Sequence, residues 1–360
     1  MTAVDAGFDF RLSDELIAHE PPEARGLARD GVRLMVSRIS DDSITHARFS
    51  ALPEFLERGD FLVVNTSATI NAALEGIHRG SDRIRTPVLL HLSAPISEWR
   101  WVVELRRFTE DGHVPFVDAQ VGDRMLLAAG GVARLIEPYL PSPAAVRAAR
   151  VRLWIAELLL PGGVRAYSER HGSPIRYGYV RDRWPLKYYQ TVFSKEPGSA
   201  EMPSAGRAFT PEMLVRLTRR GVWIAPVVLH TGVSSLEIDE PPYPERYQVP
   251  LSTARAINDA RAIGARIIAV GTTVVRALET VANDDGSVRA GHGWTDLAIT
   301  EDRGVRAVDG LLTGLHSPDT SHLSLLAAFA GRDYLNRAYE EALAHRYLWH
   351  EFGDLHLILP

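Results

Sequence analysis

Three short polar segments, each placed directly after an apolar run, hold the residues best suited to catalysis. His230 lies in the first segment and His316 in the third. Imidazole is the side chain that most readily takes and gives protons near neutral pH, so both residues are candidate acid or base groups. The second segment, residues 271–273, is a glycine followed by two threonines, and Arg276 and Glu279 come soon after it. Together the segments offer proton carriers, hydroxyls, a cation and a carboxylate.

The apolar runs before these segments are expected to be buried strands of a parallel sheet. Residues 266–270 form a brief run of β-branched character, and the glycine at 271 permits a tight turn into a helix. Thr272 or Thr273 is expected to cap the first free backbone N–H groups of that helix. Because the carboxyl ends of parallel strands meet at one edge of the sheet, the three segments are expected to line one crevice. Residues 203–206 precede another predicted helix and could add backbone donors.

Each of these features also has a purely structural interpretation. His230 could cap its strand by hydrogen bonding, and Asp319 with Thr320 could be the N-cap of a helix. Arg276 and Glu279 could be a solvated ion pair worth about 0.3 kcal/mol. Capping does not require all of these features to fall at three strand ends, however, and this coincidence favours a functional site.

The composition is that of a globular protein. The 360 residues are 46% hydrophobic and 24% charged, which is ample for a large core and favours two domains over one. The absence of cysteine excludes disulfides and thiolate chemistry and fits a cytosolic protein. The formal charge of −5 gives no overall attraction to nucleic acid, although arginine-rich segments could form a local basic patch.

No membrane span, signal peptide or metal site is expected from the sequence. No apolar run approaches the roughly 20 residues of a membrane helix, and residues 1–10 lack a basic stretch followed by an apolar one. The histidines lack metal-ligand spacing, and without cysteine a zinc site would need histidines and carboxylates. Glycine-rich dinucleotide and phosphate motifs and the serine-hydrolase elbow are absent from the sequence as well.

The order of the predicted elements divides the chain into two domains. Residues 1–75 and 181–360 alternate strands and helices, which predicts a mainly parallel α/β domain. Residues 76–180 instead contain several short strands separated by glycine, proline or charges, a pattern typical of an antiparallel barrel or sandwich. Within this inserted domain a helix is expected only over residues 144–160. The sequence therefore predicts a β-rich domain inserted into an α/β domain.

The ordered set of motifs resembles the S-adenosylmethionine:tRNA ribosyltransferase-isomerase family of the queuosine pathway. The matching segments are residues 9–10, 16–18, 59–65, 189–193, 203–206, 229–232, 271–279, 293–297, 309–313, 316–321, 329–331 and 352–354. The resemblance spans nearly the whole chain, and the inserted domain matches mainly by position. It implies a large, barrel-like, mainly parallel α/β domain with an inserted β-barrel domain.

The resemblance also implies an enzyme with S-adenosylmethionine as its substrate and tRNA as its partner. Such enzymes transfer and isomerise the ribosyl part of S-adenosylmethionine onto 7-aminomethyl-7-deazaguanine in tRNA. The product is epoxyqueuosine, and adenine and methionine are released. A cytoplasmic location is expected, a monomer is favoured, and no metal is expected.

This chemistry needs a base beside the sulfonium, an acid or donor at the departing adenine and oriented hydroxyls around the ribose. The histidines are the expected acid and base, and Arg276 or a helix N-terminus is expected to hold the methionine carboxylate. Glu279 is expected to orient Arg276 or to meet a cationic group. The candidate catalytic residues are His230, His316, Arg276 and Glu279. The candidate residues for binding S-adenosylmethionine are Ser204, Ala205, Gly206, Gly232, Gly271, Thr272, Thr273, Pro318, Asp319, Thr320 and Ser321.

The sequence departs from the family pattern at several polar positions. Ala68 and Ala73 stand where the family has arginine, Ala208 where it has histidine, and Gly314 where it has asparagine. Alanine cannot replace an arginine that grips a phosphate. Two alternatives therefore accompany the main interpretation. One is a diverged paralogue that uses S-adenosylmethionine with an acceptor other than tRNA or cleaves it alone, and the other is a non-catalytic binding protein.

Overall fold

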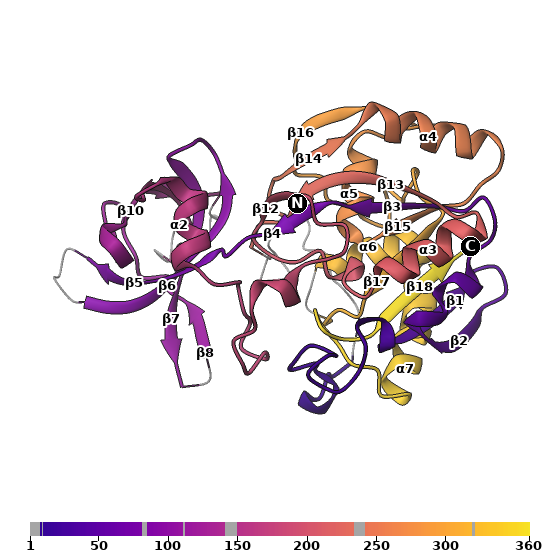
Figure 1. Ribbon diagram of the computed structural model, residues 1–360, viewed down its shortest axis with the longest axis horizontal. Coiled ribbons are helices and arrows are strands. Elements are labelled where there is room, and N and C mark those ends of the chain that lie inside the picture. Colours follow the sequence, from indigo (N-terminus) through magenta and orange to yellow (C-terminus); the bar gives the residue numbers. More distant parts are fainter. Residues whose placement is uncertain are drawn as a thin grey trace.

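The chain forms two lobes that lie side by side along its longest axis (Figure 1). A computed structural model describes residues 8, 10–80, 85–110, 112–140, 150–233, 242–318 and 321–360, without the side chain of Ser321. The larger lobe contains a mixed sheet covered by helices, and the smaller lobe contains a β-barrel. No helix in the described ranges is long and apolar enough to cross a membrane.

The larger lobe is built on a nine-stranded sheet with the order β16-β14-β13-β3-β15-β17-β18-β1-β2. Its four central strands, β13, β3, β15 and β17, all run parallel to one another. Strand β18 is antiparallel to β17 and parallel to β1, and β14 and β16 extend the other side in antiparallel pairs. The strands are β1 (Arg33–Arg38), β2 (Ser43–Arg48), β3 (Phe61–Asn65), β13 (Trp223–His230), β14 (Glu245–Val249), β15 (Ile267–Val270), β16 (Gly291–Thr295), β17 (Gly310–Gly314) and β18 (Leu355–Leu359).

Both faces of the central strands are buried, which explains their nearly continuous apolar sequences. Successive side chains of a strand point to opposite faces. Val63 accordingly belongs to the core formed with helices α4 to α7, while its neighbours Leu62 and Val64 belong to the core formed with α3 and η3. The elements on the two faces are α3 (Pro211–Arg220), α4 (Leu251–Ala262), α5 (Thr272–Thr280), α6 (Ser321–Ala330), α7 (Arg332–Ala344) and the 3₁₀ helix η3 (Phe49–Phe55).

Local sequence signals explain where the helices begin and end. Helix α3 begins after Thr210, whose side chain accepts a hydrogen bond from the N–H of Met213, and has Pro211 at its first position. It ends at Gly221 in the left-handed conformation. Gly271 precedes α5 with a φ of 97°, a conformation that favours glycine. The glycine turn between β15 and α5 is therefore confirmed.

The smaller lobe is a closed six-stranded barrel. Its strands run in the order β11-β10-β9-β5-β6-β7, and pairing of β11 with residues 100–104 of β7 closes the ring. Strand β8 pairs with residues 106–109 of β7, beyond the part that pairs with β11. Helix α2 (Gly163–His171) contributes Val164 and Tyr167 to the barrel core. The strands are β5 (Ala73–Arg79), β6 (Arg85–Pro95), β7 (Arg100–Thr109), β8 (Gly112–Pro115), β9 (Arg124–Leu127), β10 (Val132–Pro138) and β11 (Leu153–Leu159).

The predicted α/β domain with an inserted β-barrel is confirmed, with two local corrections. Helix α2 lies at residues 163–171, beyond the range in which a helix was expected. Residues 153–159 form strand β11, not the end of a helix over residues 144–160. Their burial alternates because one side of the strand faces the barrel core. Such a short apolar run does not distinguish strand from helix by periodicity. The domain boundaries at 75/76 and 180/181 stay a prediction.

Candidate active site at the carboxyl ends of the parallel strands

Asn65 joins the ends of three parallel strands at one edge of the sheet. Its side-chain amide donates to the carbonyl oxygen of Leu229 at 2.8 Å and to Oγ1 of Thr273 at 3.3 Å. Its side-chain oxygen accepts the N–H of Leu229 at 3.1 Å and that of Ser67 at 3.0 Å. Only 4% of Asn65 is exposed, so these hydrogen bonds are essential to satisfy its buried polar atoms. Two of the three predicted segments, those at His230 and at residues 271–273, therefore follow strand ends that converge.

His230 lies at the end of β13 in a tight polar surrounding. Its Nδ1 is 2.7 Å from Oγ of Ser67, which is in turn 2.6 Å from Oγ of Ser199. A Cβ atom at Gly198 would come within 2.5 Å of the same Nδ1, so the backbone of β12 (Glu196–Ser199) packs directly on the ring. Burial, helped by the charge of Arg246, lowers the pKa of His230 to about 4. The ring is therefore neutral at pH 7 and oriented by its hydroxyl partners.

His316 stacks on a second histidine, His322, which the sequence analysis did not identify. The ring centroids are 4.3 Å apart and the planes are inclined by 8°. Nδ1 of His322 is 3.2 Å from Oγ1 of Thr272, and Nε2 of His316 is 3.2 Å from Oγ1 of Thr313. Burial and the neighbouring histidines lower the pKa of His316 well below its usual range, and burial with the charge of Arg276 lowers that of His322 to about 4. Both rings are thus neutral at pH 7.

Arg276 is held by a partner other than the one expected. Its Nη1 donates to Glu245, its Nε to the carbonyl of Leu297 at 3.2 Å, and its Nη2 to two further backbone carbonyls. Glu279 instead accepts from Arg303 at 2.7 Å and from the N–H groups of Arg306 and Ala307. Neither the solvated Arg276–Glu279 pair nor an orienting role of Glu279 toward Arg276 is observed. Every guanidinium nitrogen of Arg276 is engaged with the protein itself.

The hydroxyls of the 271–273 turn do not cap α5, contrary to expectation. Gly271 is the N-cap, and no side chain accepts a capping hydrogen bond there. The threonines instead connect the strand ends to their surroundings, Thr273 through Asn65 and Thr272 through His322.

The other predicted binding residues have different surroundings. Ser204, Ala205 and Gly206 form the one-turn 3₁₀ helix η6 (Ser204–Gly206), and a Cβ at Gly271 would lie 3.4 Å from the Cβ of Ala205. The N–H of Gly232 donates to Glu245 at 3.0 Å and is not free. Pro318 follows the His316 segment and is half-buried. Asp319, Thr320 and the side chain of Ser321 lie outside the described part of the chain.

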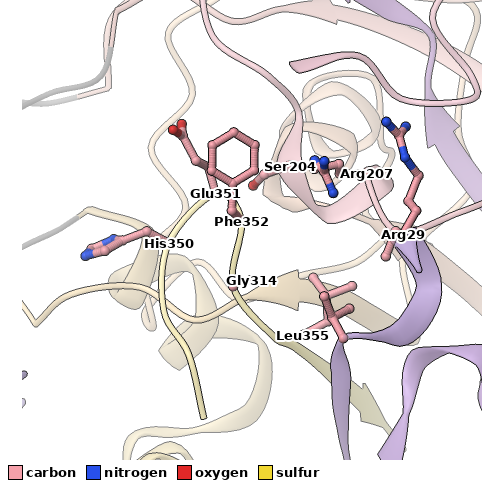
Figure 2. Close-up of a pocket in the computed structure, with 11 residues that line it drawn as sticks. Arg29, Ser204, Arg207, Gly314, His350, Glu351, Phe352 and Leu355 are labelled. Atoms are coloured by element: carbon pink, nitrogen blue, oxygen red, sulfur yellow. The ribbon is translucent and has the colours of Figure 1, made fainter. Parts of the chain in front are cut away.

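A pocket next to η6 and the end of β17 contains residues that the sequence analysis missed. Figure 2 shows Glu351 and His350 on one side of the pocket, Arg29 on the other, and Ser204 and Arg207 between them. The lining residues are Arg29, Val32, Ser204, Arg207, Ala208, Gly314, His350, Glu351, Phe352, Gly353 and Leu355.

Glu351 is the most perturbed carboxyl group of this pocket. Burial, with the nearby Glu201 carboxylate, raises its pKa to about 8, although the charge of Arg207 acts in the opposite direction. Its Oε1 is buried and has no hydrogen-bond partner. The adjacent His350 has a φ of 70°, which is strained for a residue other than glycine. No periodic or motif signal marks such a residue in the sequence, because its surroundings come from distant segments.

The departures from the family pattern are all at buried or pocket positions. Ala68 and Ala73 are 8% and 4% exposed, and Ala73 lines a separate pocket at the barrel. Ala208 and Gly314 line the pocket of Glu351. Small side chains at these two positions leave room where the family pattern has a histidine and an asparagine.

Histidines and carboxylates also meet outside this site. In the described ranges, His46, Glu341 and His345 have potential metal-ligand atoms within 4.8 Å of one another. These residues lie on β2, on α7 and just after it, and none of them lines the pocket or contacts the histidines at the strand ends.

Comparisons with known proteins agree over nearly the full length. The sequence profile of the family described as "Queuosine biosynthesis protein" matches residues 6–358. A protein from Symbiobacterium thermophilum named S-adenosylmethionine:tRNA ribosyltransferase-isomerase is 37% identical over 360 residues, which is 98% of each chain. Its namesake from Natranaerobius thermophilus is 35% identical over 355 residues, 96% of this chain and 97% of its own.

The fold also matches a solved structure. The crystal structure of S-adenosylmethionine tRNA ribosyltransferase from Thermotoga maritima superposes with a TM-score of 0.52 at 30% sequence identity. The match covers 98% of this chain and 99% of that one, so both the α/β domain and the inserted barrel are included.

Proposed function

The chain belongs to the queuosine biosynthesis protein family, and on this basis we propose that it is an S-adenosylmethionine-dependent ribosyltransferase-isomerase that acts on tRNA. It transfers and isomerises the ribosyl part of S-adenosylmethionine onto 7-aminomethyl-7-deazaguanine. Epoxyqueuosine forms in the tRNA, and adenine and methionine leave. A cytoplasmic location follows from this activity, because the chain works on tRNA. S-adenosylmethionine is a substrate, and the proposal requires no metal.

One observation carries the proposal: relatives that bear this activity in their names are 35–37% identical to the chain over at least 96% of its length. Such a match includes all four central strands and the segments that follow them. The polar residues at the strand ends supply chemistry of the required kind. This support is independent of the role of any single side chain.

His230 and His316 are the proposed proton carriers. The reaction needs a base that removes a proton next to the sulfonium, and only a neutral imidazole can accept one. Burial keeps both rings neutral at pH 7 by lowering their pKa values. Ser67 orients the ring of His230 and Thr313 that of His316. Thr272 and Thr273 are the proposed hydroxyl partners of the ribose.

The test is release of adenine from S-adenosylmethionine, first by the protein alone and then with tRNA that carries 7-aminomethyl-7-deazaguanine. We expect adenine, methionine and epoxyqueuosine only when this tRNA is present. His230→Ala and His316→Ala are each expected to slow adenine release by about 10²- to 10⁴-fold, the usual contribution of a proton-transfer group. His292→Ala on β16 is the matched control, because His292 is exposed, and its rate is expected to stay unchanged.

Other outcomes of the same assay distinguish the proposed activity from the two alternative functions. Adenine release without tRNA indicates a paralogue that cleaves S-adenosylmethionine alone. Binding of S-adenosylmethionine without adenine release under either condition indicates a binding protein and contradicts the proposed activity. Full turnover in both histidine variants removes the assigned roles but leaves the proposed activity intact.

A further inference from the structure

The pocket beside η6 has opposite electrical character at its two ends. Arg29 and Arg207 line one end and Glu351 lines the other (Figure 2). The pocket lies next to Gly314, the last residue of β17, so it is continuous with the edge where the parallel strands end. A ligand that carries both a positive and a negative charge fits such an arrangement better than a simple anion or cation.

The basic end has more positive than negative charge. Arg29 and Arg207 share one carboxylate, that of Glu23, at 3.2 Å and 2.8 Å. Arg207 also donates from Nε to the carbonyl of Tyr188 at 2.9 Å, and its guanidinium lies over the ring of Phe352 at 5.1 Å. Its Nη1 has no hydrogen-bond partner in the described part of the chain. A nearly buried guanidinium in a fixed orientation with a free donor is suited to a carboxylate.

The acidic end lacks the cation that a buried carboxylate requires. Glu351 has a buried oxygen without a partner, and no salt bridge involves it among the described residues. The ionisable groups that act on it or are acted on by it are Glu201, Arg207, Tyr179 and Tyr189, with His350 adjacent in the chain and itself neutral at pH 7. Arg207 is the one cation in this set, and it is already paired with Glu23. A buried carboxyl group in this state gains from an incoming ammonium group.

We propose that this pocket binds the zwitterion of an α-amino acid, with Arg207 holding the carboxylate and Glu351 the ammonium group. This inference rests on the proposed function, which supplies one such ligand in the methionine end of S-adenosylmethionine and another in the released methionine. It also assigns a new residue to the methionine carboxylate, since Arg276 has all of its guanidinium nitrogens engaged.

Binding is coupled to ionisation of Glu351. In the free protein at pH 7 the carboxyl group keeps its proton, because its pKa is about 8. The ammonium group of the ligand supplies the missing positive charge, so the carboxyl group ionises and its proton goes to the solvent. Release of close to one proton for each ligand bound at pH 7 is the measurable consequence.

The experiment is isothermal titration of the full chain with L-methionine and with S-adenosylmethionine, in two buffers of different ionisation enthalpy. We expect release of close to one proton at pH 7 in the wild type and none in Glu351→Gln. We also expect Glu351→Gln and Arg207→Lys to weaken binding by about 10- to 100-fold, the effect of one charge-assisted hydrogen bond. Glu212→Gln, at an exposed position on α3, is the matched control with wild-type behaviour.

Two methionine analogues separate the two ends of the pocket. 4-(Methylthio)butanoate lacks the ammonium group, so its affinity is expected to be the same for the wild type and Glu351→Gln, without proton release. 3-(Methylthio)propylamine lacks the carboxylate, so Arg207→Lys is expected to leave its affinity unchanged. Thermal unfolding of both variants checks that they are folded.

Each outcome decides the inference. Equal affinity of L-methionine and S-adenosylmethionine for the wild type and Glu351→Gln, without proton release, overturns it, as does the absence of binding by either ligand. Glu351-dependent proton release with only one of the two ligands supports the pocket and identifies its occupant as the cofactor or the product. If proton release is observed but adenine never forms, the proposed function fails while the pocket inference holds.

Discussion

Two glutamates, Glu104 in the barrel and the half-buried Glu351 in the α/β lobe, have very different surroundings. Glu104 lies in the barrel, where it is 2.8 Å from Arg106, 3.1 Å from Arg152 and 3.5 Å from His91. Burial alone would raise its pKa, but these partners outweigh burial and lower it to about 2. Glu351 lies at the edge of the α/β sheet and forms no salt bridge with any residue that the structure describes, and burial raises its pKa to about 8.

The difference in ion-pair partners distinguishes a carboxylate with a structural role from a carboxyl group that can bind a charged ligand. The charge of Glu104 is balanced within the barrel by Arg106 and Arg152. Glu351 remains neutral at pH 7 because burial and the Glu201 carboxylate outweigh the charge of Arg207, a condition typical of binding and catalytic sites. Burial alone therefore does not distinguish a structural glutamate from a functional one. The presence of charged partners at Glu104 and their scarcity at Glu351 does.

The largest expected effect is on stability, in the barrel. Glu104→Gln leaves Arg106 and Arg152 buried without their carboxylate and is expected to lower the free energy of unfolding by about 3 to 5 kcal/mol. Urea denaturation of the full chain measures this change. Glu169→Gln is the control, because its exposed pair with Arg165 is worth less than about 0.5 kcal/mol. A loss below about 1 kcal/mol in Glu104→Gln would remove the contrast between the two glutamates.

Glu351→Gln is expected to raise the free energy of unfolding, by less than Glu104→Gln lowers it. The folded-state pKa of Glu351 is above its ordinary value of 4.5, so its stabilising contribution is lost as pH rises from 4.5 through about 8. The neutral amide has no such dependence, and the variant is expected to be more stable at pH 7 by up to about 3 kcal/mol. Glu104 has the reverse sign, since its contribution is lost as pH falls from 4.5 toward 2. Urea denaturation between pH 4.5 and 8 measures this pH dependence. The same change of the free energy of unfolding with pH in Glu351→Gln and the wild type would contradict the prediction.

The sequence predicted the central strands β3, β13 and β15 well because their burial on both faces leaves continuous apolar runs. It did not predict β2, β14, β16 or β18, which extend the sheet beyond the parallel strands. It located His230, His316 and the Gly271 turn, each at the end of such a run. It failed over residues 153–159, where a short apolar run fits helix and strand equally and only closure of the barrel decides. Helix boundaries with clear signals, such as Thr210 and Gly221, were correct.

The partners of the site residues could not be predicted, because they come from remote parts of the chain. Ser67 is 163 residues from His230, and Glu245 is 31 residues from Arg276. Spacing on one helix favoured Glu279 as the partner of Arg276, but the fold brings β14 closer. The pocket of Glu351 likewise combines residues near positions 29, 204, 314 and 351. Polar residues outside a periodic pattern give no signal of such contacts.

The ionisation of Glu351 tests the central contrast most directly. It can be followed by carbon-13 NMR of side-chain-labelled glutamate, with the resonance assigned by its absence in Glu351→Gln. We predict a titration midpoint of about 8 in the free protein and a clear decrease when S-adenosylmethionine is bound. A midpoint near the ordinary value of 4.5 in the free protein, or one that S-adenosylmethionine leaves unchanged, would contradict the account.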